Sequence, residues 1–196
     1  MNDSSRLTKI VIEEGITTVG DMAFLTLGTY VTEVVLPSTV NIIRYGALAS
    51  LTALERLEIP AGVTEIGEKA FFENTALSEV KFSGDAPTIA DDAFSKVVAT
   101  AYYPAGNPTW TADVMKSYGG TITWKPIVDA KVVTSGWTGE NNWKLYENGT
   151  LVIFGNGSMK NYGYAGGQPW LDQGVDITHV IVAEGVTGIG SGAFRN

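Results

Sequence analysis

Side chains that commonly do chemistry are scarce in this chain and widely separated. His179 is its one histidine and cysteine is absent, which excludes disulfides, thiolate nucleophiles and zinc sites built from cysteine and histidine. Acidic residues occur side by side at Glu13 and Glu14, and at Asp91 and Asp92. Adjacent residues of a strand point to opposite faces, so neither pair converges on one substrate atom. The sequence predicts no catalytic residue, no metal site and no cofactor, with His179 as a solvent-facing strand residue.

The net charge and the lengths of the apolar runs limit the kinds of partner that this protein is expected to bind. With 13 Lys and Arg against 21 Asp and Glu, the net charge is −8, so the basic patch that nucleic acids require is not expected. No run approaches the roughly 18 to 20 apolar residues of a membrane-spanning helix. The polar segment Met1–Arg6 is not a signal peptide. We therefore expect no nucleic-acid partner and no membrane span, with any export signal or anchor outside this chain.

The one concentration of binding-type residues is aromatic and lies between positions 137 and 170. Rings can stack on sugars while amides hydrogen-bond to them, and Asn141, Asn142 and Gln168 are interspersed with the rings. The same rings could instead form a small core, because this region has few aliphatic residues to bury, and we favour that interpretation. The candidate glycan-binding residues on the first interpretation are Trp137, Trp143, Tyr162 and Tyr164.

The chain also contains internal sequence repeats, and these determine where the other candidate binding residues lie. Short runs of alternating apolar residues recur with steps of 24, 23 and 23 residues, and their centres are Ile12, Leu36, Ile59 and Phe82. An Ala-Phe or Ala-Leu pair ends 12 residues after each centre, at Phe24, Leu48, Phe71 and Phe94. A fifth copy has Val182 followed by Phe194. A period of this length with fixed apolar positions is typical of a solenoid, in which each turn buries its apolar face on its neighbours.

Each run is predicted to be a short β-strand, because it alternates and is rich in β-branched residues. One strand per turn should pair in parallel with the next at about 4.8 Å, which places alternate side chains on an outer strand face. A second short strand is expected later in each turn, followed by glycines such as Gly20 and Gly67 with positive φ. The candidate partner-binding residues are the outward ones of the first strands: Lys9, Glu33, Arg56, Glu58, Glu79 and Lys81, together with Val11 and Val35.

The period divides the chain into four parts. Residues 1–97 hold four repeats of about 23 residues, by the spacing that defines such units. Residues 98–126 break the period and are predicted to cap the solenoid with one short helix beginning at Asn107 and Pro108, with Trp110 packed in the cap. Residues 127–176 form a second module around a hairpin with an Asn148-Gly149 turn. Residues 177–196 are a single truncated repeat, so the chain is interpreted as a cut through a longer tandem protein.

The third repeat carries a family resemblance. Leu54–Asn74 reads LERLEIPAGVTEIGEKAFFEN, and its ordered Pro, Ile-Gly and Ala-Phe positions resemble the BspA-like leucine-rich repeats of bacterial surface proteins. The resemblance implies a right-handed leucine-rich-repeat solenoid, an α/β-type superhelix of mostly short parallel β-strands with little helix, joined here to a β-hairpin cap module. It also implies a secreted or cell-surface location and a role in binding or adhesion.

We therefore predict a non-enzymatic, secreted or cell-surface protein that binds an extracellular or host protein through the solenoid face. The mixed charges of that face favour a polar contact of modest affinity. The alternative is a carbohydrate-binding module that uses the aromatic residues between 137 and 170. Exposed strand edges and apolar stacking faces at the open solenoid ends predict self-association, expected to be dimeric.

Overall fold

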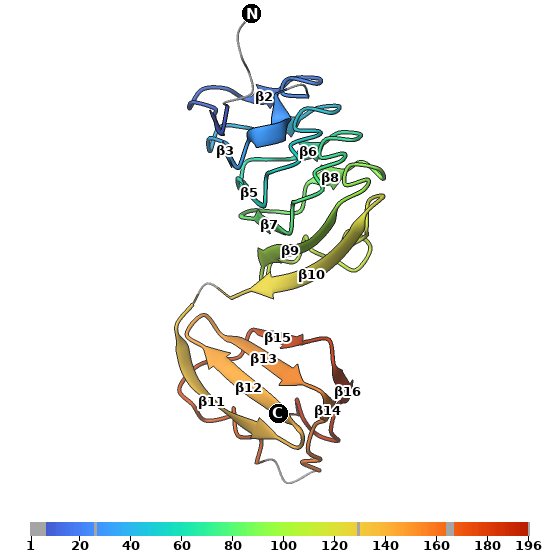
Figure 1. Ribbon diagram of the computed structural model, residues 1–196. Helices are drawn as coiled ribbons and strands as arrows, with labels where there is room; N and C mark the ends of the chain where they lie inside the picture. The colour runs from blue at the N-terminus through green and yellow to red at the C-terminus, as the bar shows by residue number, and fades with distance from the viewer. Residues whose placement is uncertain (1–6, 26, 129, 164–166, 196) are drawn as a thin grey trace, which may run out of the picture. The chain divides into compact units, whose positions relative to one another are not determined.

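The computed structural model describes residues 7–25, 27–128, 130–163 and 167–195. The chain forms two compact units, residues 1–127 and residues 128–196, which we call the solenoid unit and the second unit. Each is described by itself below (Figure 1).

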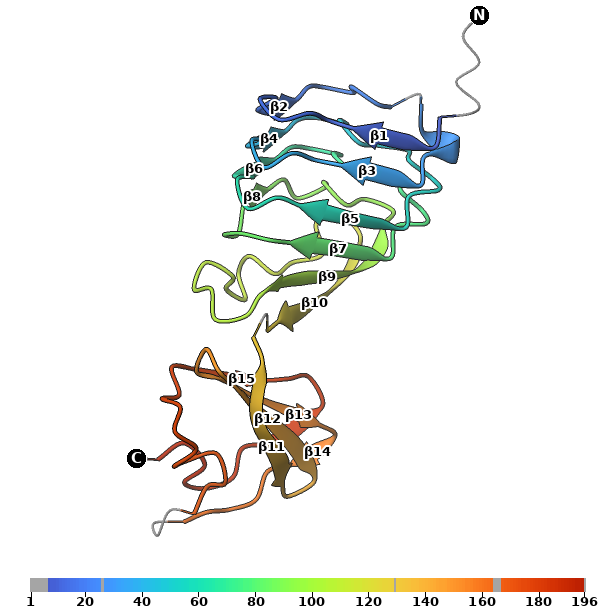
Figure 2. The same ribbon diagram turned by 90° about the vertical axis from the view of Figure 1, so that its left-hand side faces the viewer.

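The first strands of successive turns form one side of the solenoid unit. They are β1 (Lys9–Val11), β3 (Glu33–Val35), β5 (Arg56–Ile59), β7 (Glu79–Phe82), β9 (Val98–Pro104) and β10 (Thr121–Ile127). All pair in parallel, as β1–β3 and as β5–β7–β9–β10, and Figure 2 shows them side by side. Among the described residues β3 and β5 do not pair, so the ladder is interrupted between the second and third turns.

The second strands of the turns form an uninterrupted parallel ladder. It runs β2 (Thr18–Val19), β4 (Ile42–Ile43), β6 (Glu65–Ile66) and β8 (Thr88–Ile89). In the described residues the only helical element is the short 3-10 helix η2 (Gly28–Tyr30). Two parallel ladders with almost no helix confirm the predicted solenoid.

The repeated apolar positions stack in columns inside the coil. Leu57, Ile59, Ile66 and Phe71 of the third turn are all buried, and the rings of Phe71 and Phe94 stack with centroids 4.8 Å apart. Asn74 is the polar link between turns: its Oδ1 accepts the Leu51 N–H at 2.8 Å and its Nδ2 donates to Leu48 O at 3.0 Å. Because both groups of the amide are satisfied, burying it here carries little penalty.

The expectation of positive φ at Gly20 and Gly67 was wrong. The left-handed residue lies two positions later, at Met22 (φ 51°) and Lys69 (φ 54°). Gly67 instead allows a close approach between turns, because a Cβ there would lie 3.0 Å from backbone atoms of Arg44 and Tyr45 in the preceding turn.

The helix expected in residues 98–126 is also absent, and the first ladder continues through this segment although the step between strands shortens. β9 and β10 add two further rungs to the first ladder, and turns connect them. Asn107 does not cap a helix; its Oδ1 accepts hydrogen bonds from Thr109 N and Oγ1, and such local side-chain bonds compete with helix formation.

Aromatic residues close this end of the solenoid unit, as predicted for Trp110. Its ring lies 4.9 Å from Phe82 and 5.4 Å from Trp124, between centroids. Its Nε1 donates to Gly84 O at 3.0 Å, so the polar atom of this buried ring is satisfied.

The second unit is built on the predicted hairpin. β12 (Asn141–Tyr146) and β13 (Thr150–Gly155) pair antiparallel around Gly149, whose φ is 79°. β11 (Val132–Thr138) pairs with β12, and β15 (His179–Val182) pairs in parallel with β13. β14 (Gly157–Ser158) and β16 (Val186–Gly188), which follow β13 and β15 along the chain, form a separate two-stranded parallel ladder. The core contains Trp143, Leu145, Leu151, Ile153, Met159, Trp170 and Ala193.

Candidate binding surfaces

The strand face of the solenoid unit is the outward side of its first-strand ladder. Alternation along each strand buries residues such as Leu57 and Val80 and exposes their neighbours. The register places Arg56 opposite Glu79, and Glu58 opposite Lys81. The structure therefore brings four of the six predicted residues into two adjacent rows, whereas Lys9 and Glu33 form a separate row beyond the interrupted ladder.

Opposite charges on this face pair between neighbouring turns. Lys9 Nζ lies 2.9 Å from Glu33 Oε1, and Lys81 Nζ lies 3.3 Å from Glu58 Oε1. Arg56 Nε lies 3.8 Å from Glu79 Oε2. Because all six side chains remain solvent-accessible, these pairs contribute little to stability and stay available to a partner.

Glu58 has the most developed hydrogen bonding among these carboxylates. Ser83 Oγ donates a hydrogen bond to Glu58 Oε1 at 2.7 Å, and Lys81 Nζ donates to the same oxygen at 3.3 Å. The hydrogen bond from Ser83, opposed by partial burial and supported by Lys81, holds the pKa of Glu58 below its ordinary value. Glu58 is therefore a fixed negative charge at neutral pH.

Sequence reasoning missed the continuation of this face onto β9 and β10. The register aligns Lys81 with Tyr102 and Tyr102 with Lys125, so a tyrosine lies between two lysines. Thr100 and Thr123 extend the neighbouring row. The alternation within Val98–Tyr102 could have indicated a further strand of this ladder. It was overlooked because the step between the paired residues Val80 and Ala101 shortens to 21 residues.

A cleft opens on the strand face where the ladder is interrupted. Its volume is about 340 Å³, and Glu33, Val35, Glu58 and Pro60 are among its lining residues. Proline has no N–H, so Pro60 cannot donate a backbone hydrogen bond to the second turn. The cleft is therefore lined by apolar residues together with two carboxylates.

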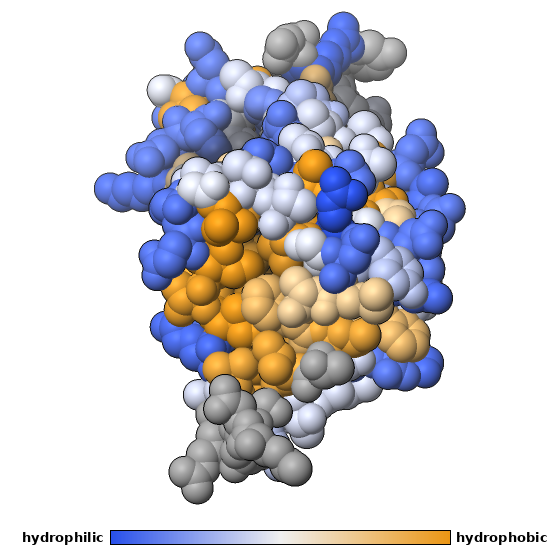
Figure 3. Space-filling view, turned by 90° about the horizontal axis from the view of Figure 1, so that it is seen from above, coloured by the Kyte–Doolittle hydropathy of each residue, from blue (hydrophilic) through white to orange (hydrophobic). Residues whose placement is uncertain are grey.

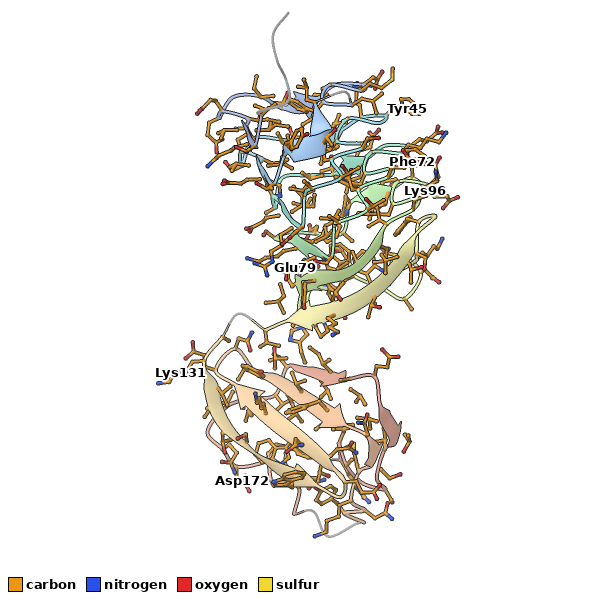
Figure 4. The ribbon with its side chains drawn as sticks, in the orientation of Figure 1. Tyr45, Phe72, Glu79, Lys96, Lys131 and Asp172 are labelled. Atoms are coloured by element: carbon orange, nitrogen blue, oxygen red, sulfur yellow. The ribbon has the colours of Figure 1, made fainter. Side chains whose placement is uncertain are left out.

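A second charged side lies away from the strand face. Lys96 Nζ lies 2.6 Å from Glu73 Oε1 and 4.9 Å from the centroid of the Phe72 ring. Figure 4 shows Tyr45, Phe72 and Lys96 along one side of the solenoid unit and Glu79 on the other. This side supplies matched controls for tests of the strand face.

The aromatic candidates of the second unit separate into two groups. Trp143 is buried, with its ring 5.9 Å from Trp170, and Tyr162 packs against the same ring while its hydroxyl donates to Thr138 Oγ1 at 2.7 Å. Trp143 belongs to the core, where a sugar does not reach its ring, and Tyr162 is partly buried against that core. Trp137 is 70% exposed. Tyr164 lies outside the described residues.

Trp137 is part of an outer sheet face that was not predicted from the sequence. The register aligns Trp137 with Asn142 and Asn142 with Phe154 across three strands. Lys144 Nζ lies 5.5 Å from the Phe154 ring centroid. An exposed ring, an amide, a second ring and a cation therefore share one flat surface.

Within the described residues no group of three His, Cys, Asp or Glu side chains could hold a metal ion. His179 is exposed at the start of β15, as predicted. The described part of the chain also contains no helix of the length and apolarity needed to cross a membrane.

Two stacked parallel ladders, internal apolar columns and a polar outer face define a leucine-rich-repeat type of β-solenoid. The chain belongs to the family described as BspA type leucine rich repeat region, whose model matches residues 2–104 in six copies. The family predicted from Leu54–Asn74 is thus confirmed. The comparison with curated proteins found no match.

Two solved structures are similar to parts of the chain. The pneumococcal vaccine antigen PcpA is 19% identical with a TM-score of 0.45, over 62% of this chain and 36% of that one. A leucine-rich repeat protein from Bacteroides ovatus ATCC 8483 is 14% identical with a TM-score of 0.28, over 96% of this chain and 64% of that one. The chain thus spans about a third of the first and under two thirds of the second. Since both scores are low, the fold assignment rests on the family match and on the strand pairing.

Proposed function

We propose that this chain is a non-enzymatic repeat protein whose strand face binds another protein. The observation that supports the proposal is the row of exposed, mutually paired charges across β5 and β7, which continues through Tyr102 to Lys125 on β10. A rigid parallel ladder holds these side chains at fixed spacing, which lowers the entropy lost when a partner binds. Tyrosine and arginine are the residue types enriched at such contacts.

The partner that fits is a polar extracellular protein surface with both signs of charge. Lys9, Arg56 and Lys81 each already have an acidic neighbour within the chain, so a partner gains there by exchanging ion pairs rather than by burying a large apolar patch. We place the protein outside the cell or on its surface, a location that accords with membership of the BspA-type repeat family. Adhesion is the role that such contacts would serve.

An array of purified extracellular proteins tests the proposal. The double variant Arg56→Gln/Lys81→Gln removes two cations from the strand face, and Arg44→Gln/Lys96→Gln removes two from elsewhere on the same unit. We expect binding signals of the unmodified chain to fall with the first variant and to persist with the second, while both keep the thermal midpoint. Signals that survive the first variant, or fall equally with both, would contradict the proposal.

A second candidate function is glycan binding at the outer sheet face of the second unit. Trp137 favours it, because a ring left 70% exposed on a flat face is available for stacking, and Asn142 lies beside it to hydrogen-bond. A glycan array with Trp137→Ala tests this, with Tyr30→Ala as a control for loss of an exposed ring in the solenoid unit. Binding that only Trp137→Ala abolishes would support it, and binding that both variants retain would contradict it.

A further inference from the structure

Three neighbouring strands of the second unit, β11, β12 and β13, contain no acidic residue. Their only charged residue is Lys144, whereas the whole chain has 21 Asp and Glu against 13 Lys and Arg. Figure 1 shows the three strands side by side. A sheet with one cation and no carboxylate is an exception on an acidic protein, and its charge favours an anionic ligand.

The exposed aromatic ring of this sheet begins a row of outward side chains. The register aligns Trp137 with Asn142 and Asn142 with Phe154. Because neighbouring strands lie about 4.8 Å apart, the row spans about 10 Å. A short chain of sugars covers this length better than a single sugar ring does.

Lys144 belongs to the next row, but its ammonium lies over the first. The register aligns Lys144 with Ser135 and Val152. Its Nζ nevertheless lies 5.5 Å from the centroid of the Phe154 ring, which is in the first row. The attraction between a cation and the face of a ring favours this position. The positive charge therefore lies at the far end of the row that begins with Trp137.

The polar groups of this row are available to a ligand. Lys144 forms no ion pair within the described part of the chain, in contrast to the three paired cations of the strand face. The side-chain amide of Asn142 makes no hydrogen bond to any described residue, whereas that of the buried Asn141 donates to Gly157 O at 2.9 Å. An amide and an ammonium thus lie side by side with free hydrogen-bonding capacity.

Two acidic residues flank β12, and neither neutralises Lys144. Glu140 precedes the strand and Glu147 follows it. The carboxylate of Glu140 accepts the Ser158 N–H at 3.1 Å, so it is bound to β14. Glu147 forms no ion pair with a described residue. The cation of the row therefore keeps its charge for a ligand.

Trp137 supplies the stacking surface of the row. It is 70% exposed, whereas Trp143 and Trp170 are buried in the core of the same unit. A large ring left in water on a flat face is a feature of binding surfaces. The C–H groups of a sugar ring pack well on such a face, while its hydroxyls hydrogen-bond to a neighbouring amide.

We propose that this row binds an acidic sugar, meaning one whose ring carries a carboxylate or a sulfate. The inference rests on the glycan binding given above as the second candidate function and names its ligand class. The sugar stacks on Trp137, its hydroxyls bond to the amide of Asn142, and its anionic group lies at the ammonium of Lys144. Since hydrogen bonds between charged groups are the stronger kind, Lys144 sets the preference for acidic over neutral sugars.

The strand face of the solenoid unit does not suit the same ligand. It carries the carboxylates of Glu33, Glu58 and Glu79, which repel an anion. Figure 3 looks down on the solenoid unit and shows hydrophilic residues along both of its sides. Nucleic acid does not suit the second unit, because a single cation cannot match closely spaced phosphates.

An array of acidic oligosaccharides tests the inference on the full chain. Oligosaccharides that contain uronic acids are printed beside their carboxyl-reduced forms, and sulfated ones beside their desulfated forms. Single-stranded DNA is included as an anion without sugar acids. We expect acidic members to bind roughly five- to tenfold more tightly than their neutral counterparts, as one charged hydrogen bond would give. The set that shows the preference identifies the anionic group as carboxylate or sulfate.

Variants of Lys144 test the assigned role. Lys144→Gln should reduce the affinity for acidic members to that for neutral ones, and Lys144→Arg should keep the preference because it keeps the charge. Lys131→Gln removes a cation just before β11 and should change neither affinity. Added salt should weaken the preference of the unmodified chain. Circular dichroism checks that each variant keeps the fold.

The outcomes separate this inference from the glycan binding on which it rests. Equal binding of acidic and neutral members that is lost in Trp137→Ala would leave glycan binding standing and overturn the acidic preference. A preference that Lys144→Gln retains, or that Lys131→Gln removes equally, would also overturn it. Binding that Trp137→Ala retains, binding of DNA alone, or no binding to any member would overturn both.

Discussion

Phe71 in the third repeat and Phe194 in the terminal repeat (residues 177–196) occupy the same sequence position but meet different surroundings. Phe71 is fully buried and stacks on Phe94 of the next turn, whereas Phe194 is 42% exposed and contacts the ring of Trp170. The residues of a turn fix which side chains point inward, but the next turn supplies half of their cover. Burial in this protein is thus a property of neighbouring turns rather than of one turn's sequence.

The largest expected effect separates these two phenylalanines directly. Phe71→Ala should cost about 3–5 kcal/mol in the free energy of unfolding, the usual range for a fully buried ring. Phe194→Ala should cost less than half as much, because its ring is already partly in water. Urea unfolding that follows each unit by its own probe would measure both; equal costs would show that the terminal repeat is covered in solution.

Buried asparagines extend the comparison to polar groups. Asn74→Ala removes two hydrogen bonds between turns and leaves Leu51 N–H and Leu48 O buried, at an expected cost of about 2–3 kcal/mol. Asn141 of the second unit is equally buried but makes one hydrogen bond to the described residues, from Nδ2 to Gly157 O. Asn141→Ala should therefore cost less, about 1 kcal/mol, and thermal unfolding of the two variants would rank them.

Glu58 should give a smaller effect with a defined pH dependence. Its pKa is lowered in the folded chain by Ser83 and Lys81, so its stabilising contribution is complete above the ordinary carboxyl pKa and is lost as pH falls through the lowered one. Glu58→Gln should lower the thermal midpoint at pH 7 and match the unmodified chain under strongly acidic conditions. Glu65→Gln, on the other ladder, serves as the control, and a difference that persists at acid pH would contradict the assignment.

The smallest effect belongs to the ion pair at the open end of the solenoid unit. Lys9→Ala breaks the pair with Glu33, in which both side chains are about half exposed, and should change the free energy of unfolding by under about 1 kcal/mol. A chemical denaturation midpoint would measure it. A larger loss would mean that the outward charges, and not the columns, hold adjacent turns together.

Much of the fold could be predicted from the sequence because a solenoid repeats one local rule. Ile12, Leu36, Ile59 and Phe82 recur at nearly constant steps; Ile59 and Phe82 end β5 and β7, whereas Ile12 and Leu36 directly follow β1 and β3. That β9 and β10 continue the first ladder was missed, because the step changes where Val80 pairs with Ala101 and the Ala-Phe pair disappears. Asn107 and Pro108 match the local pattern of a helix start, but the Asn107 side chain bonds to Thr109 instead.

The candidate surfaces were predicted less completely, since they depend on pairing between strands. Alternation alone placed Arg56 and Glu58 on the outer face, but only the register shows that each faces an opposite charge. The alternation of Asn142, Trp143 and Lys144 contained a signal that Trp143 points inward and its neighbours outward. That signal would have separated Trp143 from Trp137, which the sequence reasoning had grouped together.

Amide hydrogen exchange at single residues tests most directly the claim that the next turn supplies cover. In dilute solution Ile12 and Phe24 should exchange slowly, because their N–H groups donate to Val35 O and Ala47 O, while Val182 and Phe194 should exchange fast. If these two amides are as protected as Ile12 and Phe24 in dilute solution, the terminal repeat already has its cover and the account is contradicted.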